Sequence, residues 1–582
     1  MRNPLAQLPL LSALKDYDRE SIKGDLTAGL TTAVMLVPQG MAYAMLAGLE
    51  PIIGLYAATL PTAIYALIGS SRVLAVGPVA MVSLLVAGGV APLAGADPVL
   101  YAAYATLLML MVGAMQFGMG MARLGFLVKY LSHPVIAGFT WAAALIIGFS
   151  QFKHVLGVPI ERSHHIHSII GQAIGQVGAI HWMTLTIAII TIGTLLVLKK
   201  VSPRFPRFLL VVGLGTLAVW GFDLQAAGVA HVGDVPSGLP AFTPVSWDIG
   251  ALRALFPTAL AISLVAFMES IAVAKSFARQ HGQTIDANQE LRALGMANLG
   301  GAFFLGYPVT GGFSRTAVNA EAGAKSALAG LVTAVTVAFA LLFLTPLFFF
   351  LPKAVLAGII MTAVFGLIDL KEGKHIWKIS KADFALLTTT FFATLSLGIE
   401  LGIGIGVVTS LGWFVMTNST PHVAVLGRLP NSSIYRNIKR HPEAICVDGI
   451  VALRIDSPLF FANSAFLTNT IMTLIDENPH PVSSVVLDAA AIGSVDASGA
   501  ATLVDVAQTL KDQDIKMWLC TVRGPVRDAL KSAGLYDLLP KTQIVDRVQQ
   551  AIDHAATTPV IPLAPAELPT DDKHSRTIDF SG

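Results

Sequence analysis

Long uninterrupted apolar runs constrain the fold of this 582-residue chain more than any other feature. Hydrophobic residues make up 54% of it and charged residues 13%, a proportion that one soluble core could not bury. A helix that crosses a bilayer takes roughly 20 apolar residues, and on that measure we predict an α-helical polytopic membrane protein. About fourteen segments are predicted, near residues 26–46, 52–69, 75–90, 98–121, 132–150, 181–198, 207–222, 255–275, 290–306, 312–321, 325–350, 353–369, 382–398 and 400–417.

The distribution of Lys and Arg between these segments predicts the topology. If the N-terminus is cytoplasmic, the outside loops contain only Lys153, Arg162, Arg253 and Lys353. Because cytoplasmic loops are enriched in Lys and Arg, we expect an even number of spans in the cell inner membrane, with both termini in the cytoplasm. The basic residues are dispersed along the chain, which indicates no nucleic-acid partner.

Two of the predicted segments are broken by glycine in a similar way. AVGPVAMVSLL opens segment 75–90, and TGGFSRTAVN leads into segment 312–321. Each segment is the third of its half of seven. Matching discontinuous helices are typical of an inverted repeat whose half-helices meet at the membrane midplane. The alternative is that glycine is simply frequent in membrane helices.

After the last apolar segment the sequence changes to a soluble α/β pattern. IVALRI and SVVLDAA are predicted as buried strands, and 497–511 and 524–537 as helices. Cys446 and Cys520 are too few for a disulfide framework and suit a reducing compartment. The predicted domains are a cytoplasmic amphipathic N-terminus (1–25), a transport domain (26–417), a linker (418–435), a soluble domain (436–555) and a disordered tail (556–582).

Charged residues in the middle of a span are expensive, so each is a functional candidate. Glu269 lies within LVAFMESIAVAK, and Arg315 lies at the start of the half-helix FSRTAVN. The alternative is that the two form a structural ion pair between neighbouring helices. Glu321 and Glu400 lie near span ends, where water reaches them, and we interpret them as boundary residues.

The two half-helices predict an anion-binding site. A helix N-terminus presents free N–H groups and a partial positive charge, so two N-termini that face each other bind an anion without any metal. Pro78 at a first-turn position, followed by Val79 and Ala80, fits one N-terminus. Phe313 and Ser314 fit the other.

Three side chains extend this predicted site. Arg315 adds a full positive charge and forked donors that suit an oxyanion. In the first segment, MLVPQGMAYAML places Gln39 and Tyr43 four residues apart on one helix face, where they can line the same cavity. The alternative for Gln39 and Tyr43 is a helix-packing contact.

Uptake of a dianion requires coupling to a cation. Moving two negative charges into a cell at 100 mV costs about 4.6 kcal/mol. A carboxylate buried in the membrane is a natural proton carrier, so Glu269 is predicted to be the proton-coupling residue. No cofactor is predicted; the co-transported ion is a proton or, alternatively, sodium.

Two weaker motifs are set aside. GIGIG at 402–406 resembles a nucleotide-binding glycine pattern, but it lies inside an apolar span with no preceding strand. The HHIH cluster at 164–167 lies in a predicted outside loop without Cys partners, so we predict no metal site.

Together these residues resemble the SulP family of sulfate permeases and related anion transporters over essentially the full length. The resemblance rests on a STAS domain after the last span and on VPQGMAYAMLAGLEPIIGLYAA, GSSRVLAVGPVAMVSLL, FMESIAVAK and GYPVTGGFSRTAVN. It implies fourteen segments in two inverted repeats of seven, with a core domain that moves against a gate domain. It also implies homodimers and an anion between half-helices three and ten, surrounded by Gln39, Tyr43, Ser314 and Arg315. Relatives similar to plant sulfate permeases carry a glutamate that matches Glu269 and is linked to proton coupling.

The stretch SVVLDAAAIGSVDASGAATLVDVA resembles the phosphorylation region of STAS domains. In anti-sigma-factor antagonists a phosphorylatable Ser precedes a Gly at the helix start, and Ser498 before Gly499 matches it. Ala497 stands where a hydroxyl residue is usual. The resemblance implies a cytoplasmic regulatory partner; the alternative is that Asp496 and Ser498 only cap the helix.

The function that we predict is secondary active transport of a small inorganic anion across the inner membrane by an elevator-like movement, with proton-coupled sulfate uptake first. The alternatives within transport are a sodium-coupled bicarbonate or dicarboxylate transporter and an uncoupled anion channel or exchanger. A sensor that signals through the STAS domain and a nucleobase transporter belong to other classes. No set of nucleophile, base or metal ligands indicates an enzyme.

Overall fold

The computed structural model describes residues 17–95, 97–126, 132–160, 166–202, 205, 207–280 and 283–556. Residues 1–16 of the predicted N-terminal region, His164 and His165 of the HHIH motif, and the predicted tail from 557 lie outside this range. The chain forms two compact units that divide between Ser410 and Leu411.

The first unit is helical, and most of its helices are joined by short connections; the longest runs from 222 to 248. Its elements, with the last helix continuing into the second unit, are α2 (Arg19–Ala47), α3 (Pro51–Ala57), α4 (Leu60–Ile68), β1 (Val76–Gly77), α5 (Ala80–Ala94), α6 (Pro98–Met121), α7 (His133–Ser150), α8 (Phe152–Leu156), α9 (Ile166–Gly175), α10 (Trp182–Val201), α11 (Arg207–Gly221), α12 (Ile249–Gln280), α13 (Ala287–Ala302), β2 (Thr310–Gly311), α14 (Phe313–Glu321), α15 (Leu328–Phe339), α16 (Lys353–Phe365), α17 (Leu370–Ile379), α18 (Lys381–Leu397) and α19 (Ile399–Ser419).

The predicted apolar segments are confirmed as helices, with two local corrections. Within the described residues, nine helical segments are long and apolar enough to cross a membrane, and α5 and α11 are shorter apolar helices. The first helix begins at Arg19 because the Asp18 side chain caps it, accepting a hydrogen bond from the Ser21 N–H (2.8 Å). Residues 19–25 therefore belong to the first helix and not to a separate N-terminal region. Segment 52–69 divides into α3 and α4 because Pro61 cannot continue the preceding helix.

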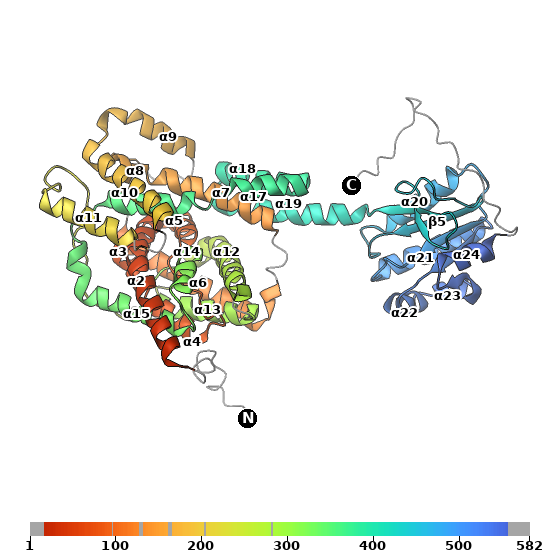
Figure 1. Ribbon diagram of the computed structural model, residues 1–582, viewed down its shortest axis with the longest axis horizontal. Helices are drawn as coiled ribbons and strands as arrows, with labels where there is room; N and C mark the ends of the chain where they lie inside the picture. Colours follow the sequence, from red (N-terminus) through yellow and green to blue (C-terminus); the bar gives the residue numbers. More distant parts are fainter. Residues whose placement is uncertain are drawn as a thin grey trace. The chain divides into compact units, whose positions relative to one another are not determined.

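The helices of the two halves interleave and pack in two groups. In the first group, α2 packs on α15, α4 on α13, and α6 on both α12 and α13. In the second, α7 packs on α16 and α18, and α10 packs on α16. Figure 1 shows the red and orange helices of the first half among the green helices of the second. These groups are the core and gate of an inverted repeat.

The two predicted discontinuous segments have matching structures. In each, a two-residue strand runs into a half-helix: β1 precedes α5, and β2 precedes α14. The strands pair antiparallel, with Val76 opposite Gly311 and Gly77 opposite Thr310. At nine residues, α14 is only about 13.5 Å long and cannot cross a bilayer by itself. The pairing of β1 with β2 therefore places the N-termini of the two half-helices next to each other.

The second unit is a soluble α/β domain. A six-stranded sheet has the order β4-β3-β5-β6-β7-β8, in which β3 pairs antiparallel with β4 and β5, and the other neighbours are parallel. Apolar residues of α20, α21, α22 and α23 cover one face of the sheet, and α24 covers the other. The elements are β3 (Val423–Arg428), β4 (Tyr435–Asn437), β5 (Ile450–Ile455), α20 (Ser464–Asp476), β6 (Ser484–Asp488), α21 (Ala497–Asp512), β7 (Lys516–Cys520), α22 (Gly524–Ser532), α23 (Leu535–Leu538), β8 (Ile544–Val545) and α24 (Val548–Ala555).

The predicted linker at 418–435 is wrong. Residues 423–428 form β3, a strand inside the sheet with β4 on one side and β5 on the other. The segment VAVLGR is short and contains glycine, so its strand character depends on the ladder that the neighbouring strands supply. The soluble domain therefore begins before residue 423 and not at 436.

Candidate functional site

The N-termini of α5 and α14 meet in the middle of the first unit. Val79 is the N-cap residue of α5 and Gly312 that of α14, and neither helix has a side-chain cap. The first-turn N–H groups of both helices have no partner within their own helix. Two positive helix ends are thus brought together by the β1–β2 pair, and this arrangement favours a bound anion.

Arg315 lies in the first turn of α14 and is 1% exposed. Its Nη1 donates to the Pro78 carbonyl oxygen, which joins the two half-helices. A Cβ added at Gly312 would lie 3.0 Å from Arg315 Nη2, so glycine at 312 makes room for the guanidinium. Arg315 Nε and Nη2 are buried and have no hydrogen-bond partner. The side chain is therefore held in place at one nitrogen, and its other two nitrogens have unused N–H groups.

Gln39 and Tyr43 are buried on α2, at 1% and 6% exposed. Both the amide nitrogen and the amide oxygen of Gln39 are buried without a hydrogen-bond partner. Tyr43 lies close enough to Arg315 for an electrostatic interaction. A helix-packing contact alone would not leave the whole Gln39 amide unsatisfied, because each buried unpaired polar atom costs about 1–3 kcal/mol.

Glu269 of α12 also faces Arg315 and interacts with it electrostatically. The Glu269 side chain forms no ion pair within 4.0 Å in the described chain, and its Oε2 is buried without a hydrogen-bond partner. The alternative of a structural ion pair between Glu269 and Arg315 is therefore wrong. Instead, an acid and a base that interact electrostatically both keep free hydrogen-bonding capacity.

The remaining predicted residues lie around the two helix N-termini. Ala80 is buried and Val79 is half-buried, whereas Phe313 and Ser314 are exposed. The Phe313 ring contacts that of Phe277, with centroids 5.8 Å apart. The site is therefore closed on the side of α2 and open on the side of Phe313 and Ser314.

Sequence reasoning missed a chain of hydroxyl groups beside Glu269. The Gly311 N–H donates to Ser270 Oγ (2.8 Å), which hydrogen-bonds Thr310 Oγ1 (2.7 Å), and Thr310 donates to the Ala266 carbonyl (2.7 Å). These bonds attach β2 to α12 and so fix Glu269 relative to α14. A hydroxyl residue directly after a mid-span acid is the sequence signal that could have identified Ser270.

A cavity of about 260 Å³ lies on the same helix faces as the site. On α2 it is lined by Thr27, Thr31 and Met35, which continue at four-residue spacing to Gln39 and Tyr43. On α14 it is lined by Val318, one turn beyond Ser314, and the far wall comes from the start of α11. The cavity thus lies about one helical turn, or 6 Å, from Gln39 along α2.

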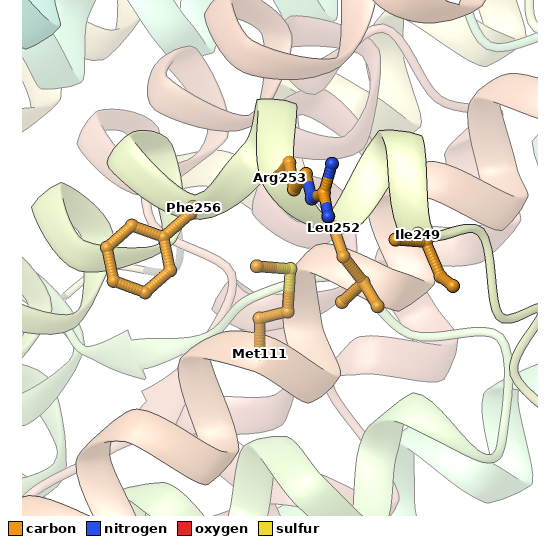
Figure 2. A pocket seen from close by; sticks show the side chains of 5 residues that line it. All are labelled: Met111, Ile249, Leu252, Arg253 and Phe256. Carbon is orange, nitrogen blue, oxygen red and sulfur yellow. The ribbon is translucent and has the colours of Figure 1, made fainter.

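A second hollow, of about 410 Å³, lies between α6 and α12 and contains none of the predicted site residues. Its lining is Met111 of α6 with Ile249, Leu252, Arg253 and Phe256 of α12, and Figure 2 shows Met111 pointing toward Leu252. Arg253 is exposed and precedes Glu269 by four and a half turns, about 24 Å along the helix. This hollow is therefore separate from the site.

In the soluble unit, Asp496 caps α21 by accepting the Gly499 N–H (2.7 Å), and Ser498 is exposed in the first turn. A Cβ at Gly499 would lie 2.9 Å from the Leu459 carbonyl, so the residue after Ser498 has to be glycine. Asp496 alone makes the cap. Within the described residues there is no cluster of three metal-ligating side chains.

The geometry and fold define a polytopic membrane transporter built from an inverted repeat, with a soluble STAS domain. Residues 22–390 match the model of the Sulfate permease family, and residues 441–551 match that of the STAS domain. The chain belongs to the sulfate permease family.

Individual relatives agree with this assignment. "Probable sulfate transporter 4.2" of Arabidopsis thaliana is 40% identical over 546 residues, which cover 91% of this chain and 80% of that protein. "Sulfate transporter 4.1, chloroplastic" of the same plant is 39% identical over 549 residues, covering 92% of this chain and 80% of the relative. Among solved structures, that of SLC26A9 superposes with a TM-score of 0.88 at 26% identity, covering 95% of this chain and 93% of the other.

Proposed function

We propose that this protein takes up sulfate into the cytoplasm across the cell inner membrane, coupled to protons. The observation that carries the proposal is that Arg315, where the two half-helix N-termini meet, and Gln39, one turn before Tyr43 on α2, both have buried groups without a hydrogen-bond partner. A tetrahedral oxyanion can accept from the free Arg315 nitrogens, the Gln39 amide and the first-turn N–H groups at once. Sequence relatives named as sulfate transporters support sulfate over other anions.

Glu269 provides the coupling in this proposal. Its unpaired Oε2 lies in the same region as Arg315, so a dianion beside Arg315 is close to a second negative charge. Two like charges in a low-dielectric site repel strongly, and a proton on Glu269 removes that repulsion. Binding of sulfate and binding of a proton at Glu269 therefore favour each other, which is the condition for symport.

The movement that we propose is elevator-like, with the core group of helices moving against the gate group. Support comes from the closer packing inside each group, as of α2 with α15 and of α10 with α16, than between the groups, which meet where α2 contacts α16. The cavity between α2, α11 and α14 is the proposed route between the site and the cytoplasm. The loop distribution of Lys and Arg supports cytoplasmic termini.

Two further interactions belong to the proposal. We expect the transporter to form homodimers in the bilayer, and a cytoplasmic partner to regulate it through the STAS domain. The exposed position of Ser498 at a helix N-terminus supports phosphorylation there, because a phosphate is electrostatically favourable at that end. We propose no cofactor, and transport rather than an enzymatic reaction.

Radiolabelled uptake into proteoliposomes tests the proposal. Sulfate uptake should rise when the outside is acidic, and unlabelled sulfate should compete at lower concentration than bicarbonate or a dicarboxylate. Uptake that requires sodium and is competed best by bicarbonate or a dicarboxylate would contradict it. Chloride or sulfate flux that follows only the electrical gradient would instead indicate a channel or exchanger.

A further inference from the structure

Glu290, near the start of α13, is a buried carboxylate with no part in the transport cycle proposed above. It is fully buried. Its Oε1 accepts from the Ser70 N–H (2.8 Å), Ser70 Oγ (2.6 Å) and the Ser71 N–H (3.2 Å), and its Oε2 accepts from the Tyr65 hydroxyl (2.7 Å). Within the described chain it pairs with no Lys, Arg or His. Glu290 therefore holds one specific segment of backbone rather than a counter-ion.

The neighbours of Glu290 hold the same segment. Gln283 donates to the Ser70 carbonyl and Gln289 donates to the Ile68 carbonyl, each at 2.6 Å. Ser71 Oγ in turn accepts the Leu74 N–H (3.2 Å). Gln283 and Gln289 thus fix the path of the backbone between α4 and β1. They do so from the other inverted repeat.

This segment leads directly to the anion site. The Ala75 N–H donates to Thr316 Oγ1 and the Ala75 carbonyl accepts from the Gly312 N–H, each at 3.1 Å. Three residues later, the Pro78 carbonyl accepts from Arg315. A shift of Ser70 and Ser71 therefore moves the backbone that orients Arg315 and the first turn of α5.

A second carboxylate offers a matched comparison. Asp25 of α2 is also fully buried and accepts from two backbone N–H groups, Lys325 (2.6 Å) and Ser326 (3.0 Å). It also accepts from Ser326 Oγ (2.5 Å) and from the Tyr17 hydroxyl. Both carboxylates thus have two backbone N–H groups, one Ser hydroxyl and one Tyr hydroxyl. Asp25, however, holds the loop beyond the C-terminal end of α14, eleven residues after Arg315.

We propose that Glu290 is a positioning residue for the anion site. By holding residues 68–71 it sets the placement of β1, and through Pro78 and Ala75 it orients the Arg315 guanidinium and the α5 N-terminus toward the anion. Asp25 has the same hydrogen-bond chemistry but stabilises a connection outside the site. The proposal rests on the proposed anion site, and it predicts that Glu290 affects affinity whereas Asp25 affects only stability.

The experiment removes the same two hydroxyls from each carboxylate in the full-length protein. One variant is Tyr65→Phe with Ser70→Ala, and its control is Tyr17→Phe with Ser326→Ala. For each, the KM and maximal rate of sulfate uptake are measured in proteoliposomes and the Tm in detergent. We expect similar falls in Tm for both, at least a fivefold higher KM for the first at an unchanged maximal rate, and a KM within twofold of wild type for the control.

Two results would overturn the proposal: an equal rise in KM for both double variants, or an unchanged KM in the Tyr65 and Ser70 variant. If either variant does not fold, Ser70→Ala and Ser326→Ala alone are compared with the same criteria. If the wild-type protein takes up another anion instead of sulfate, the proposed substrate is wrong, and the variants are compared with that anion. The failure of the substrate assignment is thus distinguished from the failure of the positioning role.

Discussion

Glu290 and Glu269 lie on neighbouring helices of the same unit, but their hydrogen-bonding environments are opposite. Glu290 accepts four hydrogen bonds from Tyr65, Ser70 and Ser71. Glu269 Oε2 has no partner, and the same is true of two nitrogens of Arg315 and of the Gln39 amide. A fully satisfied buried carboxylate stabilises the fold, whereas unsatisfied groups gathered in one place reduce stability and are retained for a ligand or a proton.

This contrast separates residues that hold the protein together from residues that act on the anion. If it is correct, removal of a satisfied group that has no link to the site, such as Asp25, should lower stability and leave affinity alone. Removal of an unsatisfied group should do the reverse.

Arg315→Ala should weaken sulfate binding at least a thousandfold, equivalent to about 4 kcal/mol, because the buried guanidinium at the helix N-termini is lost. Its Tm should change little, since the loss of the hydrogen bond to Pro78 is set against the removal of two unpaired nitrogens. Calorimetry on the purified protein measures the affinity. Arg253→Ala, at an exposed arginine of α12, is the control and should bind sulfate within twofold of wild type. Near-normal sulfate affinity in Arg315→Ala would contradict the site.

Asp25→Ala should cost about 3 kcal/mol of stability, because it leaves the buried Ser326 N–H and the partly buried Lys325 N–H without an acceptor. Thermal unfolding in detergent should show a clear fall in Tm, with sulfate affinity retained. Asp97→Ala removes an exposed helix cap with two similar N–H bonds and should cost only about 1 kcal/mol. If Asp25→Ala and Asp97→Ala lose the same stability, then burial of the carboxylate does not determine the size of the loss.

Glu269→Gln should uncouple transport from protons. A tenfold accumulation of sulfate per unit of pH gradient corresponds to about 1.4 kcal/mol, and the variant should lose this accumulation while it still exchanges labelled for unlabelled sulfate. Glu50→Gln, at an exposed residue before α3, should keep the pH drive. Proton-driven accumulation by Glu269→Gln would show that another group carries the proton.

A chain that ends after Thr420 lacks the whole soluble sheet and should bind sulfate with less than a tenfold change in affinity, under about 1.4 kcal/mol. Oligomer size, stability or maximal rate should change first. A chain that ends after residue 436 should aggregate more than one that ends after Thr420. In the longer chain β3 remains without its partner β5 and exposes a strand edge. A loss of sulfate affinity of more than about tenfold in the chain that ends after Thr420 would mean that the STAS domain shapes the site.

Asp456→Asn should have the smallest effect, because this carboxylate is partly exposed. Burial opposes its charge, but hydrogen bonds from Arg454 and His422 outweigh that and hold the pKa of Asp456 below its ordinary value of 3.8. A lowered pKa adds stability at neutral pH that is lost as the pH falls below about 4. In the wild type, hydrogen-exchange protection of β3 and β5 should decrease as the pH is lowered, and in Asp456→Asn it should decrease less steeply. At pH 7 the two proteins should differ in stability by less than about 1 kcal/mol.

The candidate site was largely readable from the sequence, and the satisfied carboxylates were not. Glu269 and Arg315 stand out because charges are rare within apolar runs, and that signal is local. Asp25 and Glu290 lie near the ends of helices, where a charge is ordinary. Their hydroxyl partners include residues 301 and 225 positions away, so only the folded chain reveals that they are buried.

The sequence by itself determined the helical class, the position of each apolar segment and the two half-helices, because the bilayer imposes a length and a composition that each segment has to meet alone. The tertiary structure decided the division of segment 52–69, the strand at 423–428 and the hydrogen bonds of each buried acid. These depend on neighbours that the chain supplies from its other half or from another strand. A local sequence pattern indicates that a polar group is costly to bury. Only the folded structure shows whether hydrogen bonds within the protein offset that cost or whether the group stays unsatisfied until a ligand binds.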